Sequence, residues 1–251
     1  MPTKKKYDQI IMGCLFTGIH DVNRNTILKK DDFSIVKEWA DSIAALNLRG
    51  LIFHNNFSAE TCLKFETENI HFIQVKHDAT FNPNVYRYFI YKEFLEENKE
   101  NIKDVFCTDI SDVVLLKNPF EQSLFLSNPN KIFCGDEPKK LNDEWMRNHA
   151  GHLRKSIADY VLYEEKFKNE VLLNCGIIGG NVAIMQQFIG DLANIHTQYN
   201  HDNETAFTGD MGAFNYLART KYNGVLCHGK PINTEFKDFD KYNSQCWFSH
   251  K

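Results

Sequence analysis

The sequence lacks a long apolar run, paired cysteines and a strong excess of either charge. No segment reaches the ~18 consecutive apolar residues of a membrane-spanning helix. No apolar stretch follows the basic start, as one does in a secretory signal. The formal net charge is only −4, so nothing indicates the clustered basic face of a nucleic-acid-binding protein. We therefore expect no transmembrane segment and no nucleic-acid partner.

The seven cysteines form no CxxC pair and lie mostly within apolar runs. Such cysteines are typical of buried, reduced thiols in a reducing compartment. With no secretion signal visible, we expect a cytoplasmic protein. A GxGxxG motif is also missing after the first apolar run, which argues against a NAD-linked dehydrogenase.

The first half of the chain contains a regular alternation of apolar runs and amphipathic stretches. The short apolar runs predict buried strands at 9–16, 50–53, 71–75 and 104–107. Apolar residues at helical spacing predict a helix after Asp31 and Asp32, and further helices at 59–67 and 84–98. Strands that alternate with helices in this way indicate a doubly wound, nucleotide-binding sheet.

The alternation is looser in the second half. We expect strands at 131–135, 171–180 and 224–227, and helices at 182–199 and 210–221. Residues 138–167 are polar and receive no assignment, and the tail from Lys230 is expected to wrap the surface. No linker separates the halves, so the sequence predicts one α/β, Rossmann-like domain over 1–251. Its central sheet should be mixed but mostly parallel, with helices on both faces.

Two carboxylates interrupt an apolar stretch in the middle of the chain. Asp109 and Asp112 follow the strand predicted at 104–107 and precede a second apolar run. Carboxylates at this end of a parallel strand stand where open α/β sheets bind ligands, and two of them can hold a hard divalent cation. Their three-residue spacing lets both reach one ion only if the chain turns between them. The alternative is that they cap a turn and face solvent.

This segment resembles a motif of a known enzyme family. Thr108-Asp109-Ile-Ser-Asp112-Val-Val, followed by Asn118-Pro-Phe120, is similar to the DxD region of GT-A fold glycosyltransferases. The resemblance implies that Asp109 and Asp112 bind Mn or Mg and that Asp109 also meets the sugar donor. It also implies a nucleotide-binding half over about 1–120 and an acceptor and sugar half over about 121–251.

Three later segments resemble the same family in the same order. Asn174-Cys-Gly176-Ile-Ile-Gly179 is similar to a strand under the donor sugar, which implies that Gly176 contacts the donor and that Asn174 is a catalytic residue, with its amide on a sugar hydroxyl. A glycine-bent core strand is the alternative. Asp210 opens a segment, Asp-Met-Gly-Ala-Phe-Asn, that is similar to one placing an acid beside the reacting carbon. A helix N-cap is its simpler role.

The third segment is His228-Gly-Lys230-Pro231, which is similar to a segment of glycogenin-like retaining enzymes, although its spacing is shorter. The resemblance implies that His228 completes the metal site and that Lys230 meets the diphosphate. A satisfied surface or core histidine is the alternative. This segment tilts the expected stereochemistry modestly toward retention.

Further donor-binding candidates come from their positions after the first strands and in the helix at 84–98. Thr17, Asn55 and Arg87 resemble residues that contact the donor in this family, whereas a solvated helix charge is the simpler role for Arg87. His149 and His152 could bind zinc, but no helix-borne glutamate accompanies them and a polar loop is expected.

Together these patterns predict a metal-dependent glycosyltransferase. It would move a sugar from a UDP- or GDP-sugar to a hydroxyl of a glycan or another acceptor. Two alternatives stay open, namely a sugar-phosphate nucleotidyltransferase and a nucleotide-sugar-binding protein without activity. The first usually carries a basic, glycine-rich loop after its first strand, and Gly13–Gly18 has no basic residue.

Overall fold

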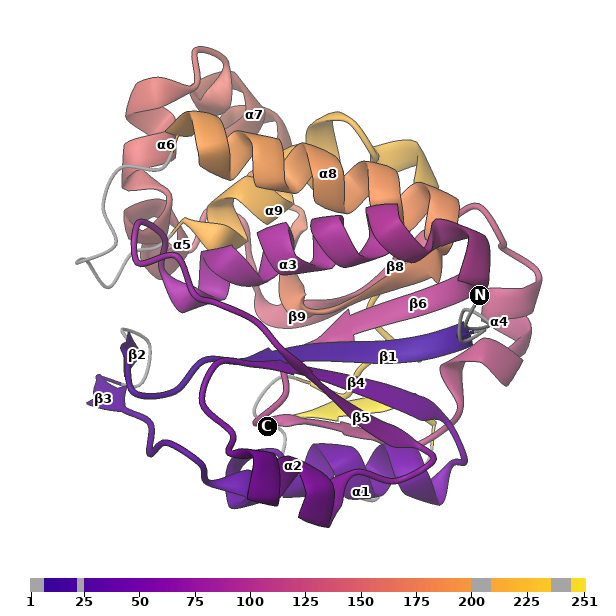
Figure 1. Cartoon of the computed structure of the whole chain (residues 1–251). Helices are drawn as coiled ribbons and strands as arrows, with labels where there is room; N and C mark the ends of the chain where they lie inside the picture. Colours follow the sequence, from indigo (N-terminus) through magenta and orange to yellow (C-terminus); the bar gives the residue numbers. More distant parts are fainter. Residues whose placement is uncertain (1–6, 22–24, 200–208, 236–244) are drawn as a thin grey trace.

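A seven-stranded sheet with helices on both faces forms the centre of the molecule (Figure 1). The computed structural model describes residues 7–21, 25–199, 209–235 and 245–251. The strands of the sheet, in spatial order, are β10 (Leu226–His228), β8 (Ile132–Lys140), β9 (Val171–Asn181), β6 (Ile102–Thr108), β1 (Asp8–Leu15), β4 (Arg49–His54) and β5 (Ile70–Gln74). Two small ladders pair β2 (His20–Asp21) with β3 (Thr26–Ile27), and β7 (Val113–Leu115) with β11 (Phe248–His250).

The sheet is mixed and mostly parallel, as the sequence predicts. Strands β5, β4, β1 and β6 are parallel neighbours. Their order is that of the mononucleotide-binding half of a doubly wound fold. Strand β9 runs antiparallel to both β6 and β8, and β10 runs parallel to β8. The α/β, Rossmann-like fold class is therefore confirmed.

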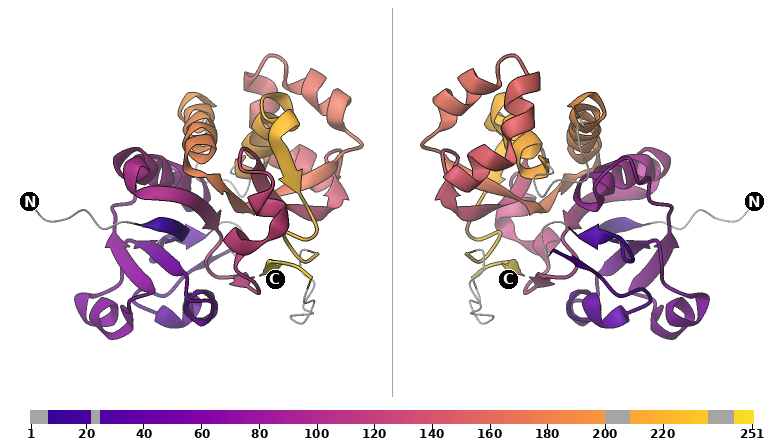
Figure 2. Two further views of the ribbon diagram at one scale, coloured as in Figure 1. Left: turned by 90° about the vertical axis from the view of Figure 1, so that its right-hand side faces the viewer. Right: turned by 90° about the vertical axis from the view of Figure 1, so that its left-hand side faces the viewer.

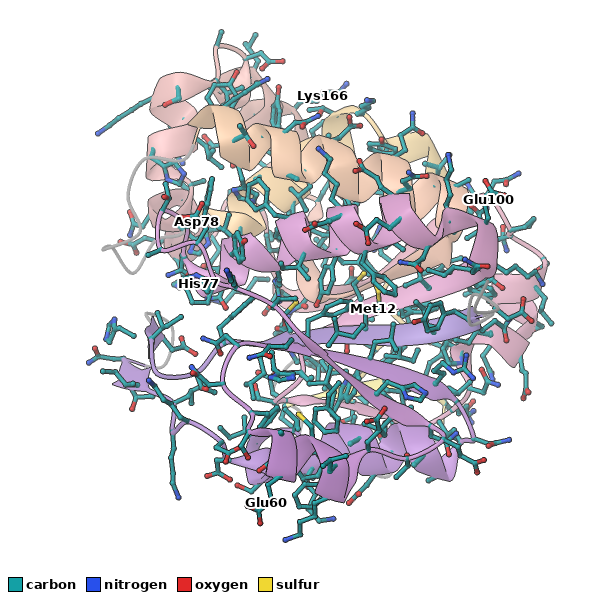
Figure 3. All side chains as sticks on the ribbon, in the orientation of Figure 1. Met12, Glu60, His77, Asp78, Glu100 and Lys166 are labelled. Carbon is teal, nitrogen blue, oxygen red and sulfur yellow. The ribbon has the colours of Figure 1, made fainter. Side chains whose placement is uncertain are left out.

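Each face of the sheet carries its own hydrophobic core. On β1, Met12 packs with α3 (Pro83–Asn98) and α8 (Val182–Tyr199), whereas the adjacent Ile11 faces α1 (Lys37–Ala45). Alternate residues of a strand point to opposite faces, so one continuous apolar strand supplies both cores. Figure 3 shows Met12 inside the molecule, with the charged side chains Glu60, Glu100 and Lys166 around its outside. α2 (Ala59–Phe65) lies on the same side of the sheet as α1 (Figures 1 and 2).

α3 begins at the end of the sheet where the parallel strands finish. Asn82 caps the helix, because its side chain accepts a hydrogen bond from the amide of Asn84 at 2.9 Å. Pro83 occupies the first helical position, where a missing N–H costs nothing. Figure 3 places His77 and Asp78, from the loop before the helix, at this same end. Arg87 consequently lies one turn into α3 and near the strand ends.

The stretch at 138–167, left unassigned by the sequence, is largely helical. Its short helices form a group beside α9 (Asp210–Thr220), as Figure 2 shows. They are α5 (Glu144–His149), α6 (Gly151–Ser156) and α7 (Tyr160–Phe167). The expectation of a polar loop around His149 and His152 is therefore wrong, since both residues lie in helices. α4 (Ser123–Leu126) precedes β8.

The expected surface position of the tail from Lys230 is also wrong for residues 230–235 and 245–251, whereas 236–244 lie outside the described part of the chain. Ile232, Trp247 and Phe248 are at most 1% exposed and pack into the core under α1. Strand β11 runs antiparallel to β7, with His250 opposite Val113. The last described segment is therefore buried, and it lies next to β7, the strand that starts directly after Asp112.

Candidate metal centre and adjoining cavity

A cavity of about 610 Å³ opens at the carboxyl ends of the central strands. Residues after β1 and β6, the start of α3, the middle of β9 and the last two residues of the chain all line it. Its volume falls within the range of small-molecule sites, and its place is where open α/β sheets bind ligands.

The chain bends between Asp109 and Asp112, which is the condition for both carboxylates to reach one metal ion. β6 ends at Thr108, a bend follows, and β7 starts at Val113. Trp39 fixes the end of the strand by donating its indole N–H to Thr108 Oγ1 at 2.8 Å. Both carboxylates reach the cavity as a result.

His250 joins these two carboxylates. Asp109, Asp112 and His250 offer one ligand atom each, and the three atoms lie within 4.8 Å of one another. The β7–β11 ladder positions the histidine, and the amide of Lys251 donates to the carbonyl of Asp112 at 2.9 Å. Two carboxylate oxygens and an imidazole nitrogen could together hold a divalent cation.

The environment of His250 suits a metal ligand. The side chain is 2% exposed, and its burial lowers the pKa of the imidazole, against the opposing effect of Asp109. A lowered pKa keeps the ring neutral near pH 7, and a neutral imidazole is the form that binds metals. Nε2 of His250 lies 3.8 Å from Oδ2 of Asp109.

His228 is not part of this cluster, which corrects the role that the resemblance implied for it. Nδ1 of His228 lies 2.9 Å from Oδ1 of Asp136, and Nε2 lies 3.5 Å from a guanidinium nitrogen of Arg219. Lys230 is exposed and does not line the cavity either. A different histidine and lysine from the C-terminal part of the chain, His250 and Lys251, line the cavity.

Arg87 connects the motif to the start of α9. Its guanidinium forms an ion pair with Asp109, and a second nitrogen lies 3.7 Å from Oδ2 of Asp210. The same nitrogen contacts the thiol of Cys175 at 3.3 Å. Burial opposes the positive charge, but Asp109 and the other neighbours raise the pKa of Arg87 well above its usual value. Arg87 lines the cavity and is only 9% exposed, which excludes a solvated helix charge. Its expected contact with the donor stays a prediction.

Asp210 is buried and does not cap its helix. Gly209 occupies the N-cap position of α9. The Asp210 side chain is 5% exposed and contacts Nε2 of His149 through Oδ1 at 2.8 Å. Both residues line the cavity. Asp210 is therefore a carboxylate held between an arginine and a histidine.

Asn174 and Gly176 occupy the cavity floor. The side chain of Asn174 accepts from the amide of Gly176 at 2.6 Å and donates to Glu137 at 2.5 Å. A Cβ at Gly176 would lie 2.5 Å from the His250 ring and 2.7 Å from the Asp109 carboxylate. A glycine is required here, because any side chain would enter the space between Asp109 and His250. Gly179 has a packing role, since a Cβ there would overlap the ring of Phe106.

Thr17 and Asn55 lie outside the cavity lining. The amide of Thr17 donates to Oδ1 of Asn55 at 3.0 Å, and Nδ2 of Asn55 donates to the carbonyl of Thr17 at 3.1 Å. These two hydrogen bonds join the segments that follow β1 and β4. The neighbouring Phe16 and Ile19 line the cavity instead.

Sequence reasoning missed His250, Lys251, Glu137, Trp145 and the partnership of His149 with Asp210. The only local signal for His250 is the apolar run Cys246–Phe248 before it, which is typical of a strand. Nothing local indicates that this strand pairs with Val113–Leu115. Such pairing depends on tertiary contacts between distant segments.

Comparisons with known proteins add no relatives. No protein-family model matches the chain, and no curated protein has a similar sequence. Within the described part of the chain, no helix is long and apolar enough to cross a membrane.

Proposed function

We propose that this protein is a metal-dependent glycosyltransferase that uses a nucleoside-diphosphate sugar as donor. The observation that carries the proposal is the convergence of Asp109, Asp112 and His250 at the carboxyl ends of the parallel strands. A divalent cation bound there would offset the charge of a diphosphate leaving group. The resemblance of 108–120 to the DxD region agrees with this chemistry.

The start of α3 adds a second anion-binding feature to the same cavity. Pro83 and Asn84 line the cavity and belong to the first turn of a 16-residue helix. Pro83 has no N–H and the amide of Asn84 is already bonded to Asn82, so this helix start contributes the positive end of its dipole, which favours a phosphate group. Arg87, one turn further on, supplies a full positive charge. These groups support a diphosphate as the ligand.

In the transfer step, the acceptor hydroxyl oxygen forms a bond to the anomeric carbon of the sugar. The bond from that carbon to the diphosphate oxygen breaks, and its electron pair leaves with the diphosphate. The acceptor proton passes to the leaving diphosphate or to water. Arg87 would neutralise part of the growing charge, while Asp210 and His149 orient groups beside the sugar.

Neither retention nor inversion of the sugar is favoured by the positions of these residues. The preference for retention depended on His228 as a metal ligand, and His228 lies beside Asp136 and Arg219. Inversion would need a base on the acceptor side. Asp210 is a candidate only in combination with His149, because its carboxylate is already in contact with that ring.

The test is hydrolysis of UDP- and GDP-sugars by the purified protein, with Mn²⁺ and with EDTA. Wild type should release nucleoside diphosphate only with metal, and Asp112→Asn should lose this release. Asp41→Asn, on the exposed face of α1, is the matched control and should behave as wild type. Exchange of pyrophosphate into a nucleoside triphosphate would indicate a nucleotidyltransferase. Binding of donor without turnover would indicate a protein that only binds nucleotide sugars.

A further inference from the structure

Trp145 offers an exposed indole to the cavity. This residue of α5 lines the cavity and is 43% exposed, whereas Trp39 and Trp247 are each 1% exposed. A large exposed aromatic ring beside a cavity is typical of a binding surface, because it leaves a broad apolar area in contact with water.

Trp145 is also connected to the proposed reaction centre by direct contacts. Its ring stacks on His149 with centroids 4.8 Å apart and an interplanar angle of 25°. His149 contacts Asp210 at 2.8 Å, and Asp210 lies 3.7 Å from Arg87. A molecule bound on the indole would therefore lie close to Asp210 and, through it, to the metal cluster.

The groups around the indole are polar and charged. Glu137 and Lys139 line the same cavity. Lys139 Nζ lies 5.4 Å from the centroid of the Trp145 ring and 3.3 Å from Oδ1 of Asp143. Lys139 contacts Asp143 and the ring at the same time, so it would keep the carboxylate as a partner if another group took its place on the ring. The apolar ring of Trp145 is thus accompanied in this cavity by the hydrogen-bonding side chains of Glu137 and Lys139.

This combination matches a sugar ring, and we propose that the acceptor is a carbohydrate whose ring stacks on Trp145. The inference rests on the proposed function, since it names the acceptor of that same site. The C–H face of a pyranose is attracted to the electron-rich face of an indole. Its hydroxyls would bond to Glu137 and Lys139, with the reactive hydroxyl directed toward Asp210 and His149.

The first experiment measures binding by tryptophan fluorescence. Methyl glycosides of glucose, galactose, mannose and N-acetylglucosamine are titrated into wild type with Mn²⁺ and UDP or GDP. At least one glycoside should give a saturable change, and Trp145→Ala should give none because its remaining tryptophans are buried. No response to any glycoside in wild type would overturn the inference.

The second experiment measures transfer to the glycoside that binds. Trp145→Ala should raise the KM for the glycoside at least tenfold, and Trp145→Phe should restore most of the loss. Leu162→Ala removes an exposed apolar side chain of α7 outside the cavity and is the matched control. Melting temperatures confirm that each variant is folded.

The outcomes separate this inference from the proposed function. An unchanged glycoside KM in Trp145→Ala would overturn the stacking. An equal loss of affinity for the nucleoside diphosphate would show that Trp145 stacks on the donor base instead, which also overturns it. Wild type that hydrolyses a nucleotide sugar but transfers to no glycoside refutes the carbohydrate acceptor alone. Wild type with no hydrolysis at all refutes the proposed function and this inference with it.

Discussion

Arg87 forms an ion pair with Asp109, so a carboxylate of the proposed metal cluster already faces a protein cation. The same guanidinium lies 3.7 Å from Asp210, which connects the metal side of the cavity to the side of α9. Charges this close influence each other strongly where water is largely excluded. Metal binding, donor binding and the position of Asp210 should consequently depend on one another.

Replacing Arg87 should affect metal and donor in opposite directions. Arg87→Gln removes the positive charge beside Asp109, so less Mn²⁺ should be needed for half-maximal binding, while the affinity for a nucleoside diphosphate should fall. The substitution also leaves the partly buried Asp109 carboxylate without its cation, so the metal-free variant should unfold more easily. Calorimetry with Mn²⁺, with and without UDP or GDP, measures both effects. Weaker Mn²⁺ binding in the variant would contradict the proposed relationship.

The assignment of the metal ligand is tested by comparing two histidines. His250→Ala should raise the Mn²⁺ concentration for half-maximal donor hydrolysis by about tenfold or more, because one of the three proposed ligands is lost. His228→Ala is the matched control and should leave that concentration unchanged, since His228 lies beside Asp136. Titration of activity with Mn²⁺ checks both variants. A raised Mn²⁺ requirement in His228→Ala, with none in His250→Ala, would show that His228 is the metal ligand.

The carboxylate of Asp210 should take part in the reaction rather than stabilise the start of α9. Asp210→Asn keeps the size of the side chain and leaves the Gly209 cap in place, but it removes the negative charge between Arg87 and His149. We expect kcat for transfer to fall by about 10²-fold, with a smaller effect on the KM for the donor. His149→Gln should show a smaller loss of kcat. Turnover of Asp210→Asn within a few-fold of wild type would show that the carboxylate has no part in the chemistry.

His196 should make the protein less stable in mild acid. The ring is 2% exposed and stacks on Tyr88 with centroids 5.7 Å apart, and its burial lowers the pKa to about 4. The unfolded chain binds this proton near pH 6.5. Stability is therefore complete above pH 6.5 and falls as the pH drops toward 4, by about 3 kcal/mol in total from this group.

Urea unfolding between pH 4 and 7.5 measures this dependence. His196→Phe cannot titrate and keeps an aromatic ring against Tyr88, so its stability should vary less across the same range. His71→Phe is the matched control, because His71 is a partly exposed histidine paired with Glu66. Equal pH dependence in wild type and His196→Phe would rule out His196 as the source.

Much of the sheet follows from local patterns. The apolar runs of the first half predict β1, β4, β5 and β6 within a few residues, because a buried parallel strand must be apolar on both faces. The second half was harder, since the short helices α5–α7 are polar and depend on α9 for their burial. Their amphipathic pattern is too short to distinguish from a loop.

The sequence by itself determined the carboxylate part of the candidate site and the α/β fold. Asp109 and Asp112 follow an apolar strand, and the family resemblance rests on those local residues. Tertiary structure alone decided which histidine joins them, because the antiparallel pairing of His250 with Val113 brings together two segments that lie far apart in the sequence. It also decided the partners of Asp210 and the exposure of Trp145. Local spacing cannot specify such contacts, since they arise only when the helices and strands pack into one core.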